Sequence, residues 1–109
     1  MNSQQVEQGE NRSREIPGWY GAPPTTVSVR KYANGGDALA GFSERGPEFT
    51  ASVFLEGKDP GEGFIWLRTW GGLGGLPYHL RDHGIVEFTG ETTPVGPYGV
   101  EAKLAKLLI

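Results

Sequence analysis

The chain has two histidines, His79 and His83, and they are four residues apart. On a helix this spacing places both imidazoles on one face, as in helical zinc sites. A metalloprotease would have a glutamate directly after the first histidine, but Leu80 follows here, and no pattern supports Glu87 as a third ligand. A solvated helix end, where the C-terminal dipole favours His83, accounts for the pair without a metal. We therefore expect no metal and no cofactor, with a metal-dependent enzyme that uses His79 and His83 as an alternative.

Residues 71–75, Gly-Gly-Leu-Gly-Gly, join a predicted strand to a predicted helix. Phosphate-binding loops use such glycines because backbone N–H groups can then approach an anion closely. The segment matches neither the Gly-x-Gly-x-x-Gly pattern nor a P-loop, and it contains no lysine. We interpret it as a connector. A small nucleic-acid- or nucleotide-binding module that uses these glycines and Arg68 is a second alternative.

Aromatic and basic side chains together could form a platform for nucleic-acid bases and phosphates. The candidates are Trp19, Tyr20, Trp66, Trp70 and Tyr78, with Arg30, Lys31 and Arg68. Trp66 shares a strand face with Phe64, however, and we expect it in the core. The formal net charge of −3, from 13 acidic and 10 basic residues, also opposes nonspecific nucleic-acid binding, which depends on neutralising phosphates. Exposed aromatic residues are equally natural at a protein interface.

No arrangement of nucleophiles or carboxylates indicates catalysis. The chain has no cysteine, and none of its serines lies in a Gly-x-Ser-x-Gly motif. Glu44 and Glu48 flank a turn, where charges are usually solvated, and they do not suggest a glycosidase pair. We expect a protein that is not an enzyme.

The length of 109 residues fits one domain. Residues 1–15 contain no apolar core of a signal peptide, and no run approaches the roughly 18 apolar residues that span a bilayer. The lack of cysteine is compatible with a reducing compartment. We expect a cytoplasmic protein without a membrane partner.

The elements that would position these residues follow from periodicity and turn signals. Residues 1–24 are polar and then proline-rich, which predicts a disordered or extended tail, and residues 25–109 predict a single domain. Apolar patterning predicts strands at 25–33, 38–42, 48–55, 64–70, 85–89 and 95–103, of which 64–70 is apolar on both faces. Leu76 and Leu80, four residues apart, indicate a helix from about 73 or 75 to 83. The order β-β-β-β-α-β-β predicts an α+β domain. It would have a mostly antiparallel sheet of five or six strands and one short helix on one face.

Local signals refine these boundaries. Asn34 and Gly35 predict a hairpin turn, Pro77 suits the first turn of a helix, and Gly84 suits the left-handed position that ends one. Residues 104–109 fit either a helix or an extension of the last strand. They could pack on their own domain or on a twin subunit, so homo-oligomerisation is open.

The order of these motifs resembles a family of small uncharacterised proteins encoded largely by bacteria, their phages and their plasmids. The matching segments are Tyr32–Gly35, Gly46–Val53, Phe64–Trp70, Gly84–Gly90 and Gly96–Val100. The family's Gly-Glu-Pro element is permuted to Gly-Pro-Glu here, and its Lys-Asp pair is Arg68-Thr69. The family has no assigned activity, so the resemblance implies no catalytic residue. It does imply an accessory protein of a mobile element.

Some small proteins of mobile elements bind and block host defences. We therefore expect a non-enzymatic, protein-binding accessory protein of a phage or other mobile element, acting in the host bacterial cytoplasm. It would be an anti-CRISPR-like inhibitor that occludes a bacterial host protein or defence nuclease complex, with acidic groups meeting a basic channel. The expected contact residues are exposed aromatics and acidic turn residues, namely Trp19, Tyr20, Glu44, Glu48, Asp59, Glu62, Trp70 and Tyr78.

Overall fold

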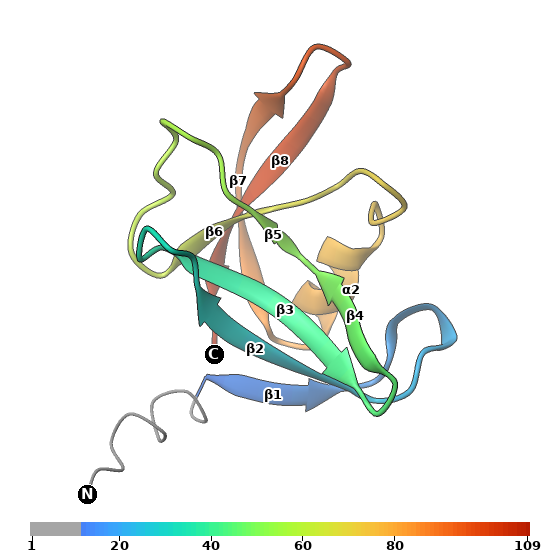
Figure 1. Cartoon of the computed structure of the whole chain (residues 1–109). Coiled ribbons are helices and arrows are strands. Elements are labelled where there is room, and N and C mark those ends of the chain that lie inside the picture. The colour runs from blue at the N-terminus through green and yellow to red at the C-terminus, as the bar shows by residue number, and fades with distance from the viewer. Residues whose placement is uncertain (1–11) are drawn as a thin grey trace, which may run out of the picture.

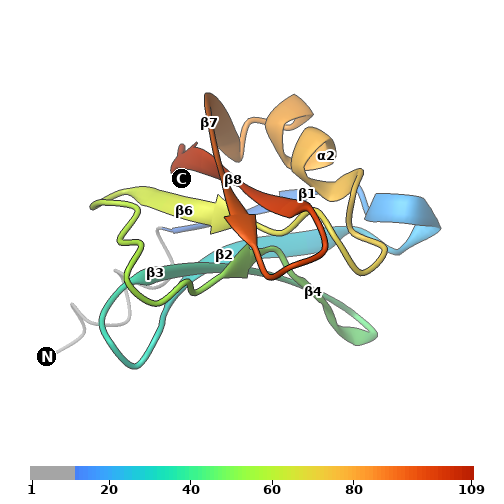
Figure 2. The same cartoon turned by 90° about the horizontal axis from the view of Figure 1, so that it is seen from above.

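The computed structural model describes residues 12–109, and in this part of the chain eight strands form two antiparallel sheets beside one α-helix (Figure 1). Sheet A has the strand order β1-β2-β3-β4, and sheet B has the order β5-β6-β8-β7. The elements are β1 (Ser13–Ile16), the 3₁₀ turn η1 (Trp19–Gly21), β2 (Thr25–Lys31), β3 (Asp37–Ser43), β4 (Gly46–Thr50), β5 (Ser52–Val53), β6 (Phe64–Leu67), α2 (Leu76–Asp82), β7 (Val86–Val95) and β8 (Val100–Leu107). Seen from above, α2 lies next to β7 on the side of sheet A that sheet B covers (Figure 2).

The α+β class, the antiparallel pairing and the helix after the Gly-Gly-Leu-Gly-Gly segment are confirmed. The expected single sheet of five or six strands is wrong, because the described residues form two four-stranded sheets. The expected order is also wrong, since six strands precede α2. An additional first strand and a strand that divides between the sheets account for these differences.

The additional strand, β1, lies within the segment predicted as a tail. It pairs with β2 from Ser13 opposite Ser28 to Ile16 opposite Thr25. Only Ile16 of its four residues is buried, so its sequence shows no clear alternation. Residues 13–16 are therefore extended as part of sheet A, while residues 1–11 of the predicted tail lie outside the described residues.

The segment predicted as one strand over 48–55 forms both β4 and β5, which meet at Ala51. The Ala51 N–H donates to the Leu39 carbonyl in sheet A at 2.8 Å, and the Ala51 carbonyl accepts from the Arg68 N–H beside β6 at 2.8 Å. Ala51 is 1% exposed. One extended segment thus leaves sheet A and enters sheet B at this buried corner.

The hydrophobic core is built from side chains of both sheets and of α2. Its largest fully buried apolar members are Val27, Leu39, Ile65, Leu67, Leu76, Leu80, Ile85 and Val86. Leu76 and Leu80 lie one helical turn apart, so α2 presents both to the core. Burying one such side chain stabilises the fold by about 1.5–3 kcal/mol. Trp66, which we expected in the core, is 6% exposed.

The local signals at the turns are confirmed. Gly35 has a φ of +93° in the hairpin between β2 and β3, where the Tyr32 N–H donates to the Gly36 carbonyl at 2.8 Å. Gly84, with a φ of +77°, ends α2, and the Ile85 N–H then donates to the Leu80 carbonyl at 2.9 Å.

The C-terminal ambiguity resolves in favour of a strand, because β8 continues to Leu107 and pairs with both β6 and β7. Within residues 12–109, no helix has the length and apolar character that crossing a membrane requires.

Candidate functional site

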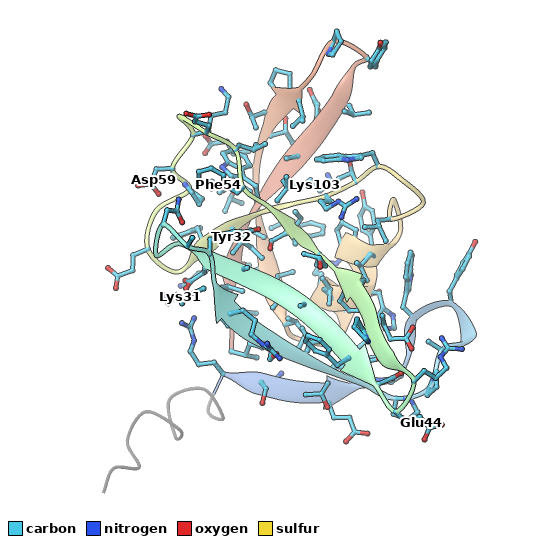
Figure 3. All side chains as sticks on the ribbon, viewed as in Figure 1. Lys31, Tyr32, Glu44, Phe54, Asp59 and Lys103 are labelled. Atoms are coloured by element: carbon cyan, nitrogen blue, oxygen red, sulfur yellow. The ribbon has the colours of Figure 1, made fainter. Side chains whose placement is uncertain are left out.

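A groove of about 700 Å³ opens between the β2–β3 turn and the loop that follows β5. The hairpin contributes Tyr32 and residues 34–37 to its walls, the loop contributes most of residues 53–62, and β6 contributes Ile65 and Trp66. We call this site the groove. Figure 3 shows Lys31, Tyr32, Phe54 and Asp59 gathered at this end of the molecule.

Two aromatic rings form one wall of the groove. Tyr32 and Phe54 have ring centroids 5.8 Å apart and an interplanar angle of 57°, a geometry that aromatic pairs favour. The Tyr32 hydroxyl is hydrogen-bonded to the Ser52 Oγ at 2.9 Å, and that Oγ also accepts the Leu39 N–H at 2.9 Å. Because Ser52 is buried, it fixes Tyr32 to the core. Phe54 leaves 51% of its surface exposed, so this wall offers an apolar ring to a ligand.

The loop between β5 and β6 is anchored by Trp66 of β6. Its indole N–H donates to the Lys58 carbonyl at 2.8 Å. The Gly61 N–H donates to Asp59 Oδ1 at 2.9 Å, and the Phe64 N–H donates to the Gly61 carbonyl at 3.1 Å. The groove is therefore bounded on both sides by segments with specific anchors.

Some charged side chains around the groove form ion pairs within the described chain, and others do not. Lys31 Nζ lies 2.6 Å from Asp37 Oδ1, and Arg12 lies 3.7 Å from the same oxygen. Asp59 and Glu62 are exposed at the rim, and neither forms an ion pair with any of residues 12–109. Lys58 is exposed on the same loop. The open carboxylates give the rim an acidic character.

A smaller hollow of about 280 Å³ lies where the strand-to-helix loop meets the β7–β8 hairpin. We call this site the hollow. It is lined by Thr69, Gly74, Tyr78, Thr92, Gly99, Val100, Glu101 and Lys103. Tyr78 meets Phe88 edge to face at 5.5 Å, and both Arg81 and Lys103 lie over these rings. Cations against ring faces distinguish the hollow from the groove.

The residues predicted to contact a partner do not form one surface. Asp59 and Glu62 line the groove, and Tyr78 lines the hollow. Glu44 and Glu48 belong to the β3–β4 turn region, and Figure 3 places Glu44 at the opposite end of the molecule from Asp59.

The predicted aromatic pair Trp19 and Tyr20 forms the turn η1. Their rings stack at 5.2 Å with an interplanar angle of 24°, and Trp19 packs against the core beside Gly75. Tyr20 is 93% exposed and has a φ of +62°, the one positive φ of a residue other than glycine in residues 12–109. A bulky residue in this conformation is strained.

Glu48 is already engaged within the chain. Arg45 donates two hydrogen bonds of 3.0 Å to its two carboxylate oxygens, and Ser43 donates one of 2.5 Å. These bonds, that from Arg45 foremost, hold the pKa of Glu48 below its ordinary value. Arg45 is exposed, whereas the Glu48 side chain is only 13% exposed, and the two are three residues apart. A local pair with a mostly covered carboxylate suits a stabilised turn better than a contact with a partner.

The two histidines lie together on α2 and at its end, with ring centroids 4.6 Å apart. His79 Nε2 is hydrogen-bonded to the Pro17 carbonyl at 2.8 Å, so one possible ligand atom is engaged. No group of three or more His, Cys, Asp or Glu side chains within residues 12–109 is arranged to hold a metal ion.

The sequence reasoning missed Tyr32, Phe54 and Lys103. Phe54 did carry a signal, because it is a large apolar residue at a position that alternation assigns to the polar side of a strand. Tyr32 and Lys103 carried none, since their roles depend on neighbours far away in the chain.

Comparison with known protein families, with curated proteins and with solved structures gave no match for this chain.

Proposed function

We propose that this chain is a protein-binding domain without catalytic activity, and that its groove receives an extended basic segment of a partner protein. One observation carries the proposal. The half-exposed ring of Phe54, braced by Tyr32, lies in a groove whose rim carries the unpaired carboxylates of Asp59 and Glu62.

The recognition chemistry follows from these groups. A lysine or arginine of the partner would place its cation over the Phe54 ring, a contact that contributes about 0.5–2 kcal/mol depending on desolvation. Asp59 and Glu62 would meet neighbouring cations of the same segment. Carboxylates at a rim mainly raise the association rate and exclude acidic partners. The ring would therefore supply most of the affinity and the rim most of the selectivity.

The resemblance in motif order supports a more specific partner. We propose a bacterial defence nuclease or a related nucleic-acid-binding complex, whose basic channel the domain would occlude. Such channels present arginines and lysines in extended arrays because they must neutralise phosphates. The acidic rim and aromatic wall of the groove are complementary to that chemistry.

The test compares an arginine- and lysine-rich peptide with a peptide of the same length in which glutamate replaces each basic residue. Calorimetry at low salt should detect binding of the basic peptide and no binding of the acidic one. Phe54→Ser should weaken that binding by about tenfold, the loss expected for one buried aromatic contact. Tyr98→Ser is the matched control, because Tyr98 is 88% exposed and lies outside the groove.

The partner class is tested separately. The purified domain should inhibit target cleavage by a defence nuclease, and its Phe54→Ser variant should inhibit less. Equal affinity for both peptides, or equal loss in the Tyr98→Ser control, would contradict the groove as the binding site.

A further inference from the structure

Within residues 12–109 four strands lie at the edge of a sheet, namely β1 and β4 of sheet A and β5 and β7 of sheet B. An edge strand has unpaired N–H and C=O groups along one side, and another chain can pair with them. Proteins prevent such pairing by placing proline or charged side chains in the edge strand. The residues of each edge therefore indicate whether it could accept an added strand.

Three of these four edge strands carry such residues. β4 contains Pro47 and β7 contains Pro94. β1 contains Arg14 and Glu15, both of which are exposed. Residues 52–55, which are β5 and the two residues after it, read Ser-Val-Phe-Leu and contain neither proline nor charge. In the described chain, β5 is thus the edge that lacks this protection.

The backbone of the residue after β5 is directed away from sheet B. β5 pairs on one side with β6, with Val53 opposite Trp66. In a paired strand the backbone groups of successive residues point alternately toward the partner strand and away from it. Because the Ala51 carbonyl is bonded on the β6 side, Val53 also faces β6 and Phe54 faces away from it.

Phe54 is the residue that presents this edge to a partner. It lines the groove and leaves 51% of its surface exposed. In the part of the chain that the structure describes, its N–H and carbonyl form no hydrogen bond with the backbone. Ser52, the other residue that faces away from β6, is buried, and its Oγ accepts the Leu39 N–H. Exposed backbone groups at a sheet edge allow a peptide to bind as an added strand.

We propose that the segment bound in the groove joins sheet B as a further strand beside β5. This inference rests on the proposed function, because it assumes that the groove binds a basic segment of a partner protein. The partner residue opposite Phe54 would exchange two backbone hydrogen bonds with it. The side chains of two directly opposite residues lie on the same face of a sheet. That partner residue is therefore the lysine or arginine whose cation lies over the Phe54 ring.

The added strand determines which partner sequences fit. The partner residues before and after the cation point to the other face of the strand. On that face lie Val53 and Leu55, which are half-buried and line the groove. Apolar, β-branched side chains pack well in such a position. The preferred partner segment thus alternates basic and apolar residues, and it has no proline opposite Phe54, since proline lacks the N–H.

The first test compares two peptides of the same composition, one that alternates arginine with valine and one in which the arginines are adjacent. Calorimetry should show that the alternating peptide binds about tenfold more tightly, because its arginines all lie on one face of a strand. Two further versions of the alternating peptide carry backbone N-methyl groups, on every arginine or on every valine. Methylation of the arginines should weaken binding by about tenfold, since it removes the N–H groups that face β5. Methylation of the valines should change binding by less than about twofold.

The second test measures the hydrogen bond on the protein itself. In the complex with the alternating peptide, the Phe54 amide should exchange its proton with solvent about tenfold more slowly than in the free chain. The amides of β7, the opposite edge strand of sheet B, are the matched control and should exchange at an unchanged rate. Phe54→Ser removes the ring and keeps the backbone, so its weaker binding should show the same dependence on peptide methylation.

Two results would overturn the added strand and leave the groove as the binding site. They are equal affinity for the alternating and the adjacent-arginine peptides, and equal loss from both kinds of methylation. Failure of every basic peptide to bind would instead overturn the proposed function, so the two failures are distinguishable. Light scattering tests the remaining occupant. A dimer whose Phe54 amide is protected without peptide would assign this edge to a second copy of the chain and would also overturn the proposal.

Discussion

The groove and the hollow use the same kinds of residue in different arrangements. In the groove the lysine on the hairpin is bound to Asp37, and the carboxylates of Asp59 and Glu62 form no ion pair with any of residues 12–109. In the hollow Lys103 lies over the Phe88 and Tyr78 rings, and Glu101 lines the same space. The net charge of −3 describes neither region. Which charges are already paired within the fold therefore decides what each surface can bind.

The two regions also differ in how they are held. The groove's aromatic wall is attached through Ser52, whose hydroxyl is buried and serves a backbone amide as well. The loop at the hollow is attached through Thr69, whose bond to the Glu101 carbonyl is exposed. Buried hydrogen bonds are more costly to lose than exposed ones. The groove should be the more rigid of the two.

The largest expected effect tests whether the groove and the hollow unfold together as parts of one cooperative core. Leu39→Ala removes a fully buried side chain and should lower the free energy of unfolding by about 2–5 kcal/mol. Urea unfolding followed by NMR at Phe54 and at Lys103 should give one common midpoint, shifted equally at both positions. Separate midpoints would show that the regions unfold independently.

A second substitution tests the difference in attachment. Ser52→Ala leaves the Leu39 N–H without its buried acceptor and should cost about 1–3 kcal/mol, whereas Thr69→Val should cost about 0.5 kcal/mol. Thermal and urea unfolding measure both. If Thr69→Val proved the costlier change, the hollow and not the groove would be the better anchored region.

A third change removes the acidic character of the groove alone. Asp59→Asn combined with Glu62→Gln should slow association with a basic peptide several-fold at low salt and leave the NMR signals of Lys103 in the hollow unchanged. Stopped-flow measurements over a range of ionic strength would show the wild-type advantage vanish as salt is raised. A parallel change in the Lys103 signals would mean that the two surfaces are not separate.

The smallest effect concerns the carboxylate that belongs to neither region. Because its folded pKa is lowered, Glu48 contributes stability that is present above its unfolded pKa and is lost as pH falls through the folded value. An NMR titration should find Glu48 below the ordinary glutamate pKa, and Arg45→Gln should raise it toward that value. If Glu48 titrated at the ordinary glutamate pKa in the wild type, its carboxylate would not be held by Arg45 and would again be a candidate contact for a basic partner.

Local signals in the sequence predicted those parts of the fold that local chemistry decides. Gly84 and the Asn34–Gly35 turn could be placed because left-handed backbone favours glycine. β1 could not, since it buries one side chain and depends on β2 for its pairing. The break at Ala51 was also invisible, because alternation continues through the corner. Neither the groove nor the hollow could be predicted from the sequence, because each brings together residues from separate strands.

The corner at Ala51 has a mechanical consequence. Two stacked sheets joined by a flexible linker could move apart about that linker as a hinge. Here the linking residue, Ala51, is hydrogen-bonded to sheet A through its amide and to the Arg68 amide beside β6 of sheet B through its carbonyl. A ligand at either end should therefore meet a frame already closed, and binding should move side chains and loops without parting the sheets.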